Sequence, residues 1–308
     1  MNLKIEVIKQ MLKHNSFDGL VVRQILTSFK DDIALIPLKF SKEQKVIRTR
    51  LNNNDVFDNI HELSYPPAEF ARTDRASLKG KPMFYASIFT KDFERTNALP
   101  RCVSALETST LLKTKGAFDS ETITQSVWGI NSPIHLFAFP FSNKYKRSCE
   151  DIGIIKTEAE TMLRDNFSVE SIVFFTFLGD LMAEPNYSCL YDVTATCVDF
   201  ILEKFNYDGI LYPSVPIEGQ GLNICIKPHV VDESICFIEA VLETIVRRGD
   251  KSEIRIIAKS NMIHNDSFLW VITDDGKDFM INLGLLGPEL RDNDIFVSSQ
   301  ELMNNITI

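Results

Sequence analysis

The feature that most constrains the fold is a change of hydrophobic pattern near Lys45. Up to about residue 40, apolar residues recur at helical spacing, as at Leu3, Val7 and Met11, and predict a pair of helices. Beyond that point, apolar runs of strand length alternate with turn residues, over 46–51, 83–89, 135–141, 172–178, 210–215 and 222–227. Crossover helices do not join these runs regularly, which favours a mixed α+β core over a doubly wound parallel sheet.

Helical spacing predicts further helices over 98–112, 157–166 and 193–205, and through 237–245. The tail adds a strand over 254–259 and a hairpin whose strands, 268–273 and 279–283, flank the turn 274–277. No linker rich in Pro or Ser interrupts the chain. We therefore expect a helical N-terminal segment (1–44), a central domain with a mixed β core (45–230) and an α/β C-terminal extension (231–308).

The charge balance argues against one large class of partners. The 308 residues carry 33 basic and 42 acidic side chains, a net charge of −9. Direct electrostatic binding of nucleic acid instead requires clustered Lys and Arg. No apolar run approaches the ~20 residues of a membrane span, and charged residues interrupt the N-terminal apolar positions, unlike those of a signal peptide. We expect a cytoplasmic protein that binds neither nucleic acid nor a membrane directly.

The six cysteines and five histidines are dispersed along the chain, without the paired spacing of a structural zinc site. Most cysteines have apolar neighbours, which is typical of reduced, buried thiols. The sequence therefore predicts no metal site. It also lacks a phosphate-binding P-loop, a nucleophile elbow, a metalloprotease helix and a dinucleotide-binding glycine motif.

Two basic features are compatible with phosphate binding. In the segment 47–51, alternation places Arg48 and Arg50 on one face of a short strand, either as a solvated edge or as a clamp for phosphate oxygens. Further on, a basic, glycine-containing loop with Arg75 runs into a strand that carries Tyr85. Such a loop either wraps an anion beside an aromatic ring or simply feeds a core strand.

Two further features concern a carboxylate and a strand end. Glu107 lies at the edge of the apolar stripe of its predicted helix, so it has either a buried partner or a function. The segment 207–215, Tyr-Asp-Gly-Ile-Leu-Tyr-Pro-Ser-Val, turns at Asp208-Gly209 and ends a strand near Ser214. Read singly, each of these features has an ordinary structural explanation.

Their order along the chain resembles the RES domain family, named for its arginine, glutamate and serine. Arg-x-Arg on a strand, an arginine-containing loop into Phe-Tyr-Ala-Ser, a helix with Leu-Glu-Thr and the segment 207–215 carry the resemblance, which covers roughly residues 45–230. It implies a fold similar to ADP-ribosyltransferases of the diphtheria-toxin type and an activity that consumes NAD. Known members are bacterial toxins that break NAD by hydrolysis or phosphorolysis and are inhibited by a cognate helix-turn-helix antitoxin.

Carried over by position, the resemblance implies catalytic roles for Arg48, Glu107 and Ser214. It implies NAD binding by Arg48, Arg50, Arg75 and Tyr85, with NAD as the substrate and no metal. Three departures from the family are a long separation between Tyr85 and Glu107, Thr49 where some members carry an aromatic residue, and extensions at both ends of the resembling region.

Three hypotheses follow. The first is an NAD-cleaving toxin or defence effector, with NAD and an antitoxin as partners and a homodimer as the default assembly. The second keeps the same residues but transfers ADP-ribose to a protein acceptor. The third is a nucleotide-binding scaffold without catalytic activity, in which Glu107 belongs to a structural ion pair.

Overall fold

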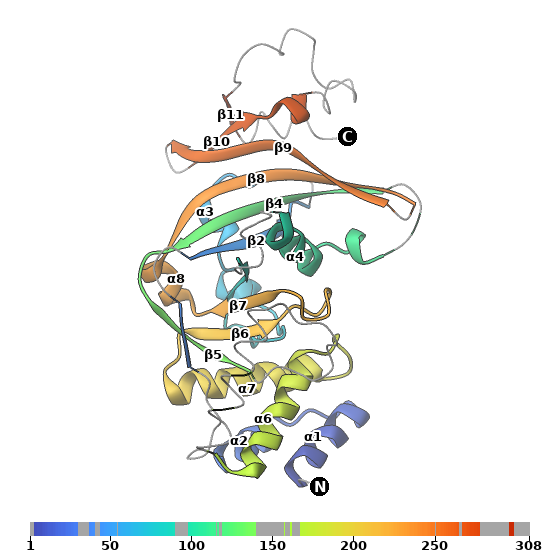
Figure 1. Cartoon of the computed structure of the whole chain (residues 1–308), viewed down its shortest axis with the longest axis vertical. Helices are drawn as coiled ribbons and strands as arrows, with labels where there is room; N and C mark the ends of the chain where they lie inside the picture. The colour runs from blue at the N-terminus through green and yellow to red at the C-terminus, as the bar shows by residue number, and fades with distance from the viewer. Residues whose placement is uncertain are drawn as a thin grey trace. The chain divides into compact units, whose positions relative to one another are not determined.

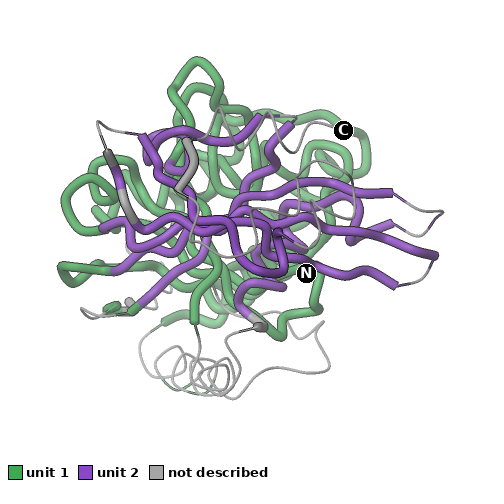
Figure 2. Tube along the Cα trace, turned by 90° about the horizontal axis from the view of Figure 1, so that it is seen from above, with its two compact units in different colours: residues 1–44, 65–97, 130–235 green, residues 45–64, 98–129, 236–308 purple. Residues whose placement is uncertain are grey.

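The computed structural model describes residues 3–29, 37–40, 44–53, 55–89, 98–114, 116, 119–139, 157, 161, 167–249, 251–264, 267–277 and 296–298. The chain divides into two compact units, each assembled from three stretches of sequence (Figure 2). Unit 1 comprises 1–44, 65–97 and 130–235, and unit 2 comprises 45–64, 98–129 and 236–308. The division by sequence at residues 44 and 230 stays a prediction.

Unit 1 begins with the predicted helix pair, α1 (Leu3–His14) and α2 (Gly19–Thr27), which is confirmed. The Asp18 side chain caps α2 by accepting hydrogen bonds from the amides of Leu20 and Val21. The N-terminal segment is not helical throughout, however. Residues 37–40 form strand β1, paired antiparallel with β5, so the expectation of a helical segment over 1–44 is wrong in this part.

The sheet of unit 1 has the order β1-β5-β6-β7-β3, of which β5, β6 and β7 are labelled in Figure 1. Its strands are β1 (Pro37–Phe40), β5 (Ile134–Ala138), β6 (Gly209–Pro213), β7 (Leu222–Ile226) and β3 (Phe84–Ile88). β5 and β6 are parallel, whereas β1–β5, β6–β7 and β7–β3 are antiparallel. The sheet is therefore mixed, and the predicted α+β class is confirmed.

The helices of unit 1 correct one prediction. Besides α1 and α2, the described part of unit 1 has α6 (Val169–Met182), α7 (Leu190–Phe205), α8 (Pro228–Ser234) and the short 3-10 turn η1 (Ala68–Phe70). The strand predicted over 172–178 is part of α6. Ser168 caps this helix through the Ser171 amide, and a continuous apolar run cannot by itself distinguish a buried helix from a buried strand. The predicted helix 157–166 lies outside the described residues, except for 157 and 161.

Unit 2 is built on a sheet of order β2-β4-β8-β9-β10-β11. Its strands are β2 (Lys45–Leu51), β4 (Asp119–Ile130), β8 (Ile235–Arg248), β9 (Lys251–His264), β10 (Ser267–Ile272) and β11 (Phe296–Ser298). The described part of the unit also contains the helices α3 (Ile60–Leu63) and α4 (Ala98–Thr108) and the 3-10 turn η3 (Leu111–Lys113). Strand β4 was not among the predicted strands.

The helix predicted through Phe237, Val241 and Ile245 is wrong, because these residues lie in strand β8, which pairs antiparallel with β9. A spacing of four residues fits one helix face, but it is also an even number and fits one strand face. Of the predicted hairpin, 268–273 coincides with β10, 274–277 forms a single helical turn, and 279–283 lies outside the described residues.

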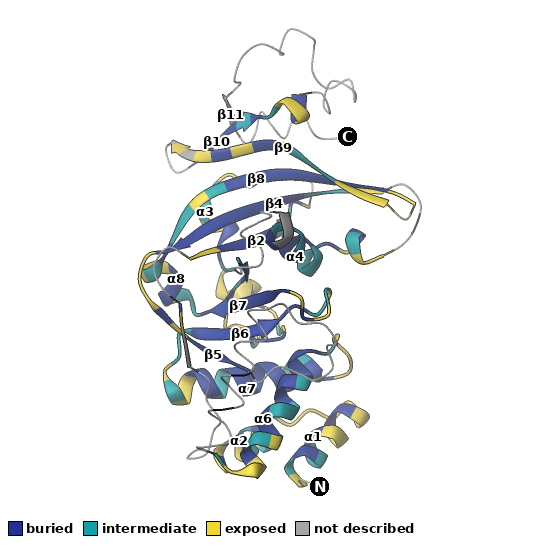
Figure 3. Ribbon diagram, viewed as in Figure 1, coloured by how far each residue is buried: buried dark blue, intermediate teal, exposed yellow. Residues whose placement is uncertain are grey.

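Burial in the two units follows the sheets (Figure 3). Strands β6 and β7 are buried along their whole length, and β8 is buried over most of its C-terminal half. Ala105, Leu111, Ile123 and Ile245 form a core cluster of unit 2 that joins α4 and η3 to β4 and β8. A polar side chain on β6, on β7 or in the buried part of β8 is therefore inside the protein and needs a partner or a function.

Candidate functional site

Arg48 and Arg50 project from the same face of β2, as the alternation predicts. Arg48 Nε donates to the carbonyl of Leu63 at 3.1 Å, and Arg50 Nη1 donates to the carbonyl of Glu62. Both acceptors belong to α3. Both side chains are half-buried, so the structure brings the two guanidinium groups together beside α3 and holds them by backbone carbonyls.

Helix α3 is fixed by its own capping box. The Asn59 side chain accepts from the Glu62 amide at 3.2 Å, and the Glu62 carboxylate accepts from the Asn59 amide at 3.1 Å. The Arg50 guanidinium also lies 5.2 Å from the centre of the Phe57 ring. Burial lowers the pKa of Arg50, and the nearby Glu62 carboxylate partly opposes this effect. Unit 2 thus presents two positioned cationic groups.

Glu107 lies on the other side of this strand. Thr49, between the two arginines, donates through Oγ1 to Ser104 Oγ of α4 at 2.7 Å, and Thr108 Oγ1 donates to the Thr49 carbonyl at 3.3 Å. Helix α4 therefore packs on the face of β2 opposite to the one from which Arg48 and Arg50 project (Figure 1). Glu107 is half-buried on the flank of α4, and its carbonyl accepts from Lys113 Nζ at 2.8 Å.

Arg75, in unit 1, is engaged by the protein itself. Its side chain is buried, and Nη1 donates to the carbonyls of Met182 at 2.7 Å and Glu184 at 2.9 Å. Nη2 lies 3.2 Å from the Tyr191 hydroxyl, and the guanidinium stacks 5.0 Å from the Tyr191 ring centre. A cation at the carbonyl end of α6 is favoured by the helix dipole, so these contacts indicate a structural role for Arg75.

Replacing Arg75 with methionine is expected to lower the free energy of unfolding of unit 1 by about 2 kcal/mol, because the carbonyls that it satisfies would lose a charged donor. Far-ultraviolet circular dichroism during urea unfolding measures the effect, since unit 1 carries α1, α2, α6 and α7. Arg72→Met is the matched control, because Arg72 is in the same loop but exposed. Equal unfolding midpoints for the two variants would contradict the structural role.

Tyr85 holds the loop that precedes its own strand. Its hydroxyl donates to Ser77 Oγ at 2.9 Å and accepts from the Ala76 amide at 3.1 Å. Burial raises the pKa of Tyr85 well above its usual value, so the hydroxyl stays protonated and can donate. The basic loop and the aromatic strand predicted from the sequence are thus joined by Tyr85.

A row of polar side chains crosses β6, β7 and β3, and sequence reasoning missed it. Ser87 pairs with Asn223, which pairs with Tyr212, in the register of the three strands. All three are buried, and Ser87 Oγ donates to Asn223 Oδ1 at 2.8 Å. Ser214 follows Tyr212 by two residues and is also fully buried. The available signal was a polar residue at alternate positions of otherwise apolar strands.

The Asp208-Gly209 dipeptide joins three strands rather than making a simple turn. Asp208 Oδ2 accepts from the His135 amide at 2.7 Å, and the Asp208 carbonyl accepts from the Lys227 amide at 2.9 Å. A Cβ atom on Gly209 would lie 2.2 Å from the carbonyl oxygen of Cys225. Glycine is therefore required by the close approach of β7, and the most specific segment of the RES resemblance has a packing explanation of its own.

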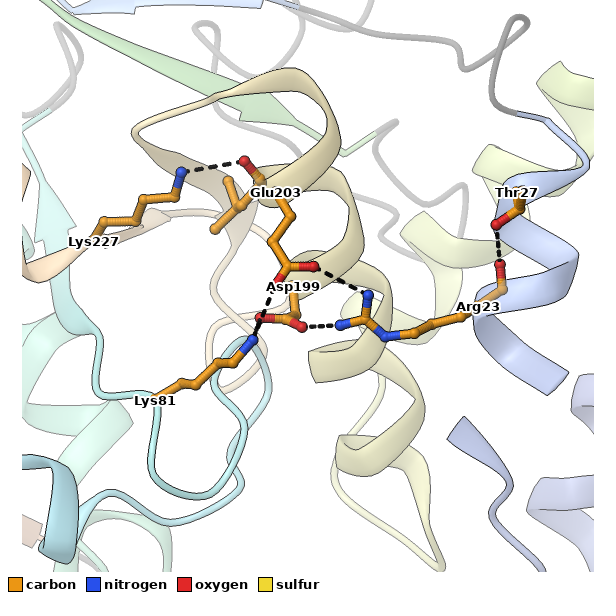
Figure 4. A network of polar contacts seen from close by, with 7 residues as sticks. Arg23, Thr27, Lys81, Asp199, Glu203 and Lys227 are labelled. Atoms are coloured by element: carbon orange, nitrogen blue, oxygen red, sulfur yellow. Dashed lines mark hydrogen bonds and ion pairs between the residues drawn. The ribbon is translucent and has the colours of Figure 1, made fainter. Parts of the chain in front are cut away.

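A charged network fixes the end of the loop that precedes β3 to α2 and α7 of unit 1 (Figure 4). Lys81 Nζ lies 2.6 Å from Asp199 Oδ1 and 3.0 Å from Glu203 Oε1 on α7, while Arg23 of α2 pairs with the same two carboxylates. The hydrogen bond from Lys81 is the largest cause of the lowered pKa of Glu203. All four charges are paired within the network, which indicates a structural function.

The predicted residues thus fall into two sets. Arg48, Arg50 and Glu107 belong to unit 2, and the others, Arg75, Tyr85 and Ser214, belong to unit 1. Within unit 2 the structure brings the two arginines together and places Glu107 across β2 from them. No group of His, Cys, Asp and Glu suited to holding a metal ion occurs among the described residues.

Comparison with known proteins adds no family assignment: no protein-family model matches the chain, and no curated protein matches it. In the part of the chain that the structure describes, no helix combines the length and the apolar character required to cross a bilayer.

Proposed function

We propose that this protein binds NAD and cleaves its nicotinamide–ribose bond, as the resemblance to the RES domain family implies, on a fold of the ADP-ribosyltransferase type. The observation that carries the proposal is the arginine pair of β2. Arg48 and Arg50 leave one strand in parallel and are held by two successive carbonyls of α3. Guanidinium groups fixed in this way match the oxygens of a pyrophosphate.

The proposed reaction breaks the bond between the ribose C1′ and the nicotinamide nitrogen, and nicotinamide leaves with the bonding electrons. Positive charge develops on the ribose, as in glycoside cleavage. The Glu107 carboxylate would hold a ribose hydroxyl and stabilise this charge, while Arg48 and Arg50 neutralise the pyrophosphate. For Tyr85 and Ser214, which belong to unit 1, stacking on nicotinamide and a hydrogen bond to an amide or ribose oxygen stay predictions from the resemblance alone.

A second candidate, a nucleotide-binding scaffold without catalysis, is favoured by one observation. Arg48 projects from one face of β2, whereas the helix that carries Glu107 packs on the opposite face, where it forms hydrogen bonds with Thr49. In this case the arginine pair would bind a nucleotide pyrophosphate and Glu107 would take no part. NAD binding without nicotinamide release distinguishes this candidate from the enzyme.

The deciding experiment measures nicotinamide released from NAD by the purified protein, with and without inorganic phosphate, beside calorimetric binding of NAD. Release that depends on phosphate indicates phosphorolysis, and release without phosphate indicates hydrolysis. Adenine-labelled NAD tests the transferase alternative, because the label then ends on protein. If the protein releases no nicotinamide, labels no protein and does not bind NAD, both candidates are contradicted.

As a toxin or defence effector, the protein would act in the cytoplasm by draining NAD, and a cognate antitoxin and a second copy of this chain are its proposed partners. Induced expression in a bacterial host is expected to lower cellular NAD before growth stops. Growth arrest at normal NAD levels would contradict this part of the proposal.

A further inference from the structure

The helix that carries Glu107 is tied to strand β8 by a buried ion pair. Arg101 of α4 places Nη1 3.2 Å from Glu243 Oε1 and Nη2 3.2 Å from Glu239 Oε1. The Glu243 side chain is 4% exposed and that of Glu239 is 37% exposed. Nη1 also lies 3.5 Å from Gln125 Oε1 of β4. One guanidinium thus joins α4 to two strands inside unit 2.

The cations near Glu243 do not offset the free-energy cost of burying its carboxylate. Burial raises the pKa of Glu243 to about 7, although Arg101 from α4 and Lys259 from β9 both act to lower it. The Cys102 thiol also faces this carboxyl group from α4. Glu243 Oε2 has no hydrogen-bond partner among the described residues. A buried carboxylate with an unsatisfied oxygen costs stability, so stability does not explain a glutamate here.

Strand β8 also holds the far end of the same helix. Arg247 Nη1 donates to the carbonyls of Leu111 at 3.3 Å and Thr114 at 3.0 Å, and to Thr114 Oγ1 at 2.8 Å. These acceptors follow the C-terminus of α4. The contacts of α4 with β2, by contrast, come from Ser and Thr hydroxyls, which rotate to suit a shifted partner. A guanidinium–carboxylate pair in the interior has a stricter geometry.

We propose that Glu243 is a positioning residue for Glu107, fixing through Arg101 where α4 sits on the sheet. The catalytic consequence rests on the proposed function, because Glu107 must first be the carboxylate that stabilises the ribose cation. The anchoring of α4 does not rest on it. The displacement that matters is small, since misplacing a reacting group by about 1 Å costs roughly a hundredfold in rate.

Glu243→Gln separates positioning from stability. The variant is expected to lower kcat for NAD roughly ten- to a hundredfold, with KM unchanged because Arg48 and Arg50 are untouched. At pH 8 the urea midpoint of unit 2 should rise, because a buried charge is removed, while amide hydrogen exchange across 98–108 becomes faster. A merely structural role would move kcat and stability in the same direction. Glu253→Gln, in an exposed ion pair of β9, is the control and should change none of these quantities.

Arg101→Met is the second variant, in case Glu243→Gln folds poorly. It should repeat the loss of kcat and the faster exchange of α4, but with a lower urea midpoint, because Glu243 loses its cation. Unchanged kcat and unchanged exchange of α4 in Glu243→Gln would overturn the proposal. If the wild-type protein cleaves no NAD, the proposed function fails, and exchange of α4 alone then decides whether Glu243 anchors the helix.

Discussion

Arg48→Ala is expected to reduce nicotinamide release from NAD by about 10²–10³-fold, the size of effect seen when one preorganised electrostatic group is removed from an active site. The loss should appear in both the binding of NAD and the rate, because the guanidinium would neutralise the pyrophosphate throughout the reaction. The fold should survive, since the hydrogen bond from Arg48 to the Leu63 carbonyl is of a kind that contributes about 1 kcal/mol net.

Two substitutions make this result specific. Arg48→Lys keeps the charge but loses the planar fork, so it should recover only part of the activity. Arg72→Ala removes an exposed arginine of unit 1 and should leave release unchanged. Activity in Arg48→Ala equal to that of the wild type would contradict the phosphate clamp, and with it the observation that carries the proposed function.

Glu107→Gln belongs to the same experiment because it separates the two candidate functions. Glutamine has nearly the same shape as glutamate, and the substitution keeps the backbone carbonyl that accepts a hydrogen bond from Lys113. The enzyme hypothesis requires a large loss of kcat at unchanged NAD affinity. If Arg48→Ala abolishes NAD binding while Glu107→Gln changes neither NAD binding nor kcat, the result favours the scaffold hypothesis. The placement of α4 across β2 from Arg48 favours the same hypothesis.

The elements that the sequence predicted correctly are those with one unambiguous period. The alternation in β2 placed Arg48 and Arg50 on one face, and the structure confirms it. The helical stripe of α7 was also clear. The wrong predictions arose where the hydrophobic pattern did not distinguish a helix from a strand. The apolar run in α6 had no clear period, and the four-residue spacing in β8 suited both a helix and a strand.

The candidate site was less predictable than the fold because contacts decide the roles of its residues. The sequence offered Arg75 as a candidate for binding an anion, but its guanidinium donates to two carbonyls near the end of α6. No local pattern could reveal these acceptors, which lie more than a hundred residues further along the chain. Glu243 was missed for the same reason, since its significance comes from Arg101 on another element.

Glu243 also makes the stability of unit 2 depend on pH. Its folded-state pKa is about 7, against 4.5 for an unperturbed glutamate. Between these values the unfolded chain has released the proton and the folded chain has kept it. The stabilisation is therefore full below about pH 4.5, falls as the pH rises, and is lost above about pH 7. A pKa shift of this size changes the free energy of unfolding by about 3 kcal/mol across this pH range.

Tryptophan fluorescence can follow this effect in the correct unit, because both tryptophans, Trp128 and Trp270, lie in unit 2 and are buried. Urea unfolding of the wild type should show a midpoint that falls from pH 5 to pH 7.5. Glu243→Gln cannot titrate, so its midpoint should lack this component, and the difference between the two curves isolates Glu243 from all other carboxylates. Parallel curves would contradict the raised pKa.

The direction of this slope is the informative part. A salt bridge that stabilised the fold would depress the pKa of its carboxyl group and make unit 2 more stable as the pH rises. Arg101 lies 3.2 Å from Glu243, yet loss of water outweighs its attraction. A falling midpoint would therefore show that the cost of burying ionised Glu243 exceeds its attraction to Arg101 at neutral pH, so a gain in stability does not account for the pair.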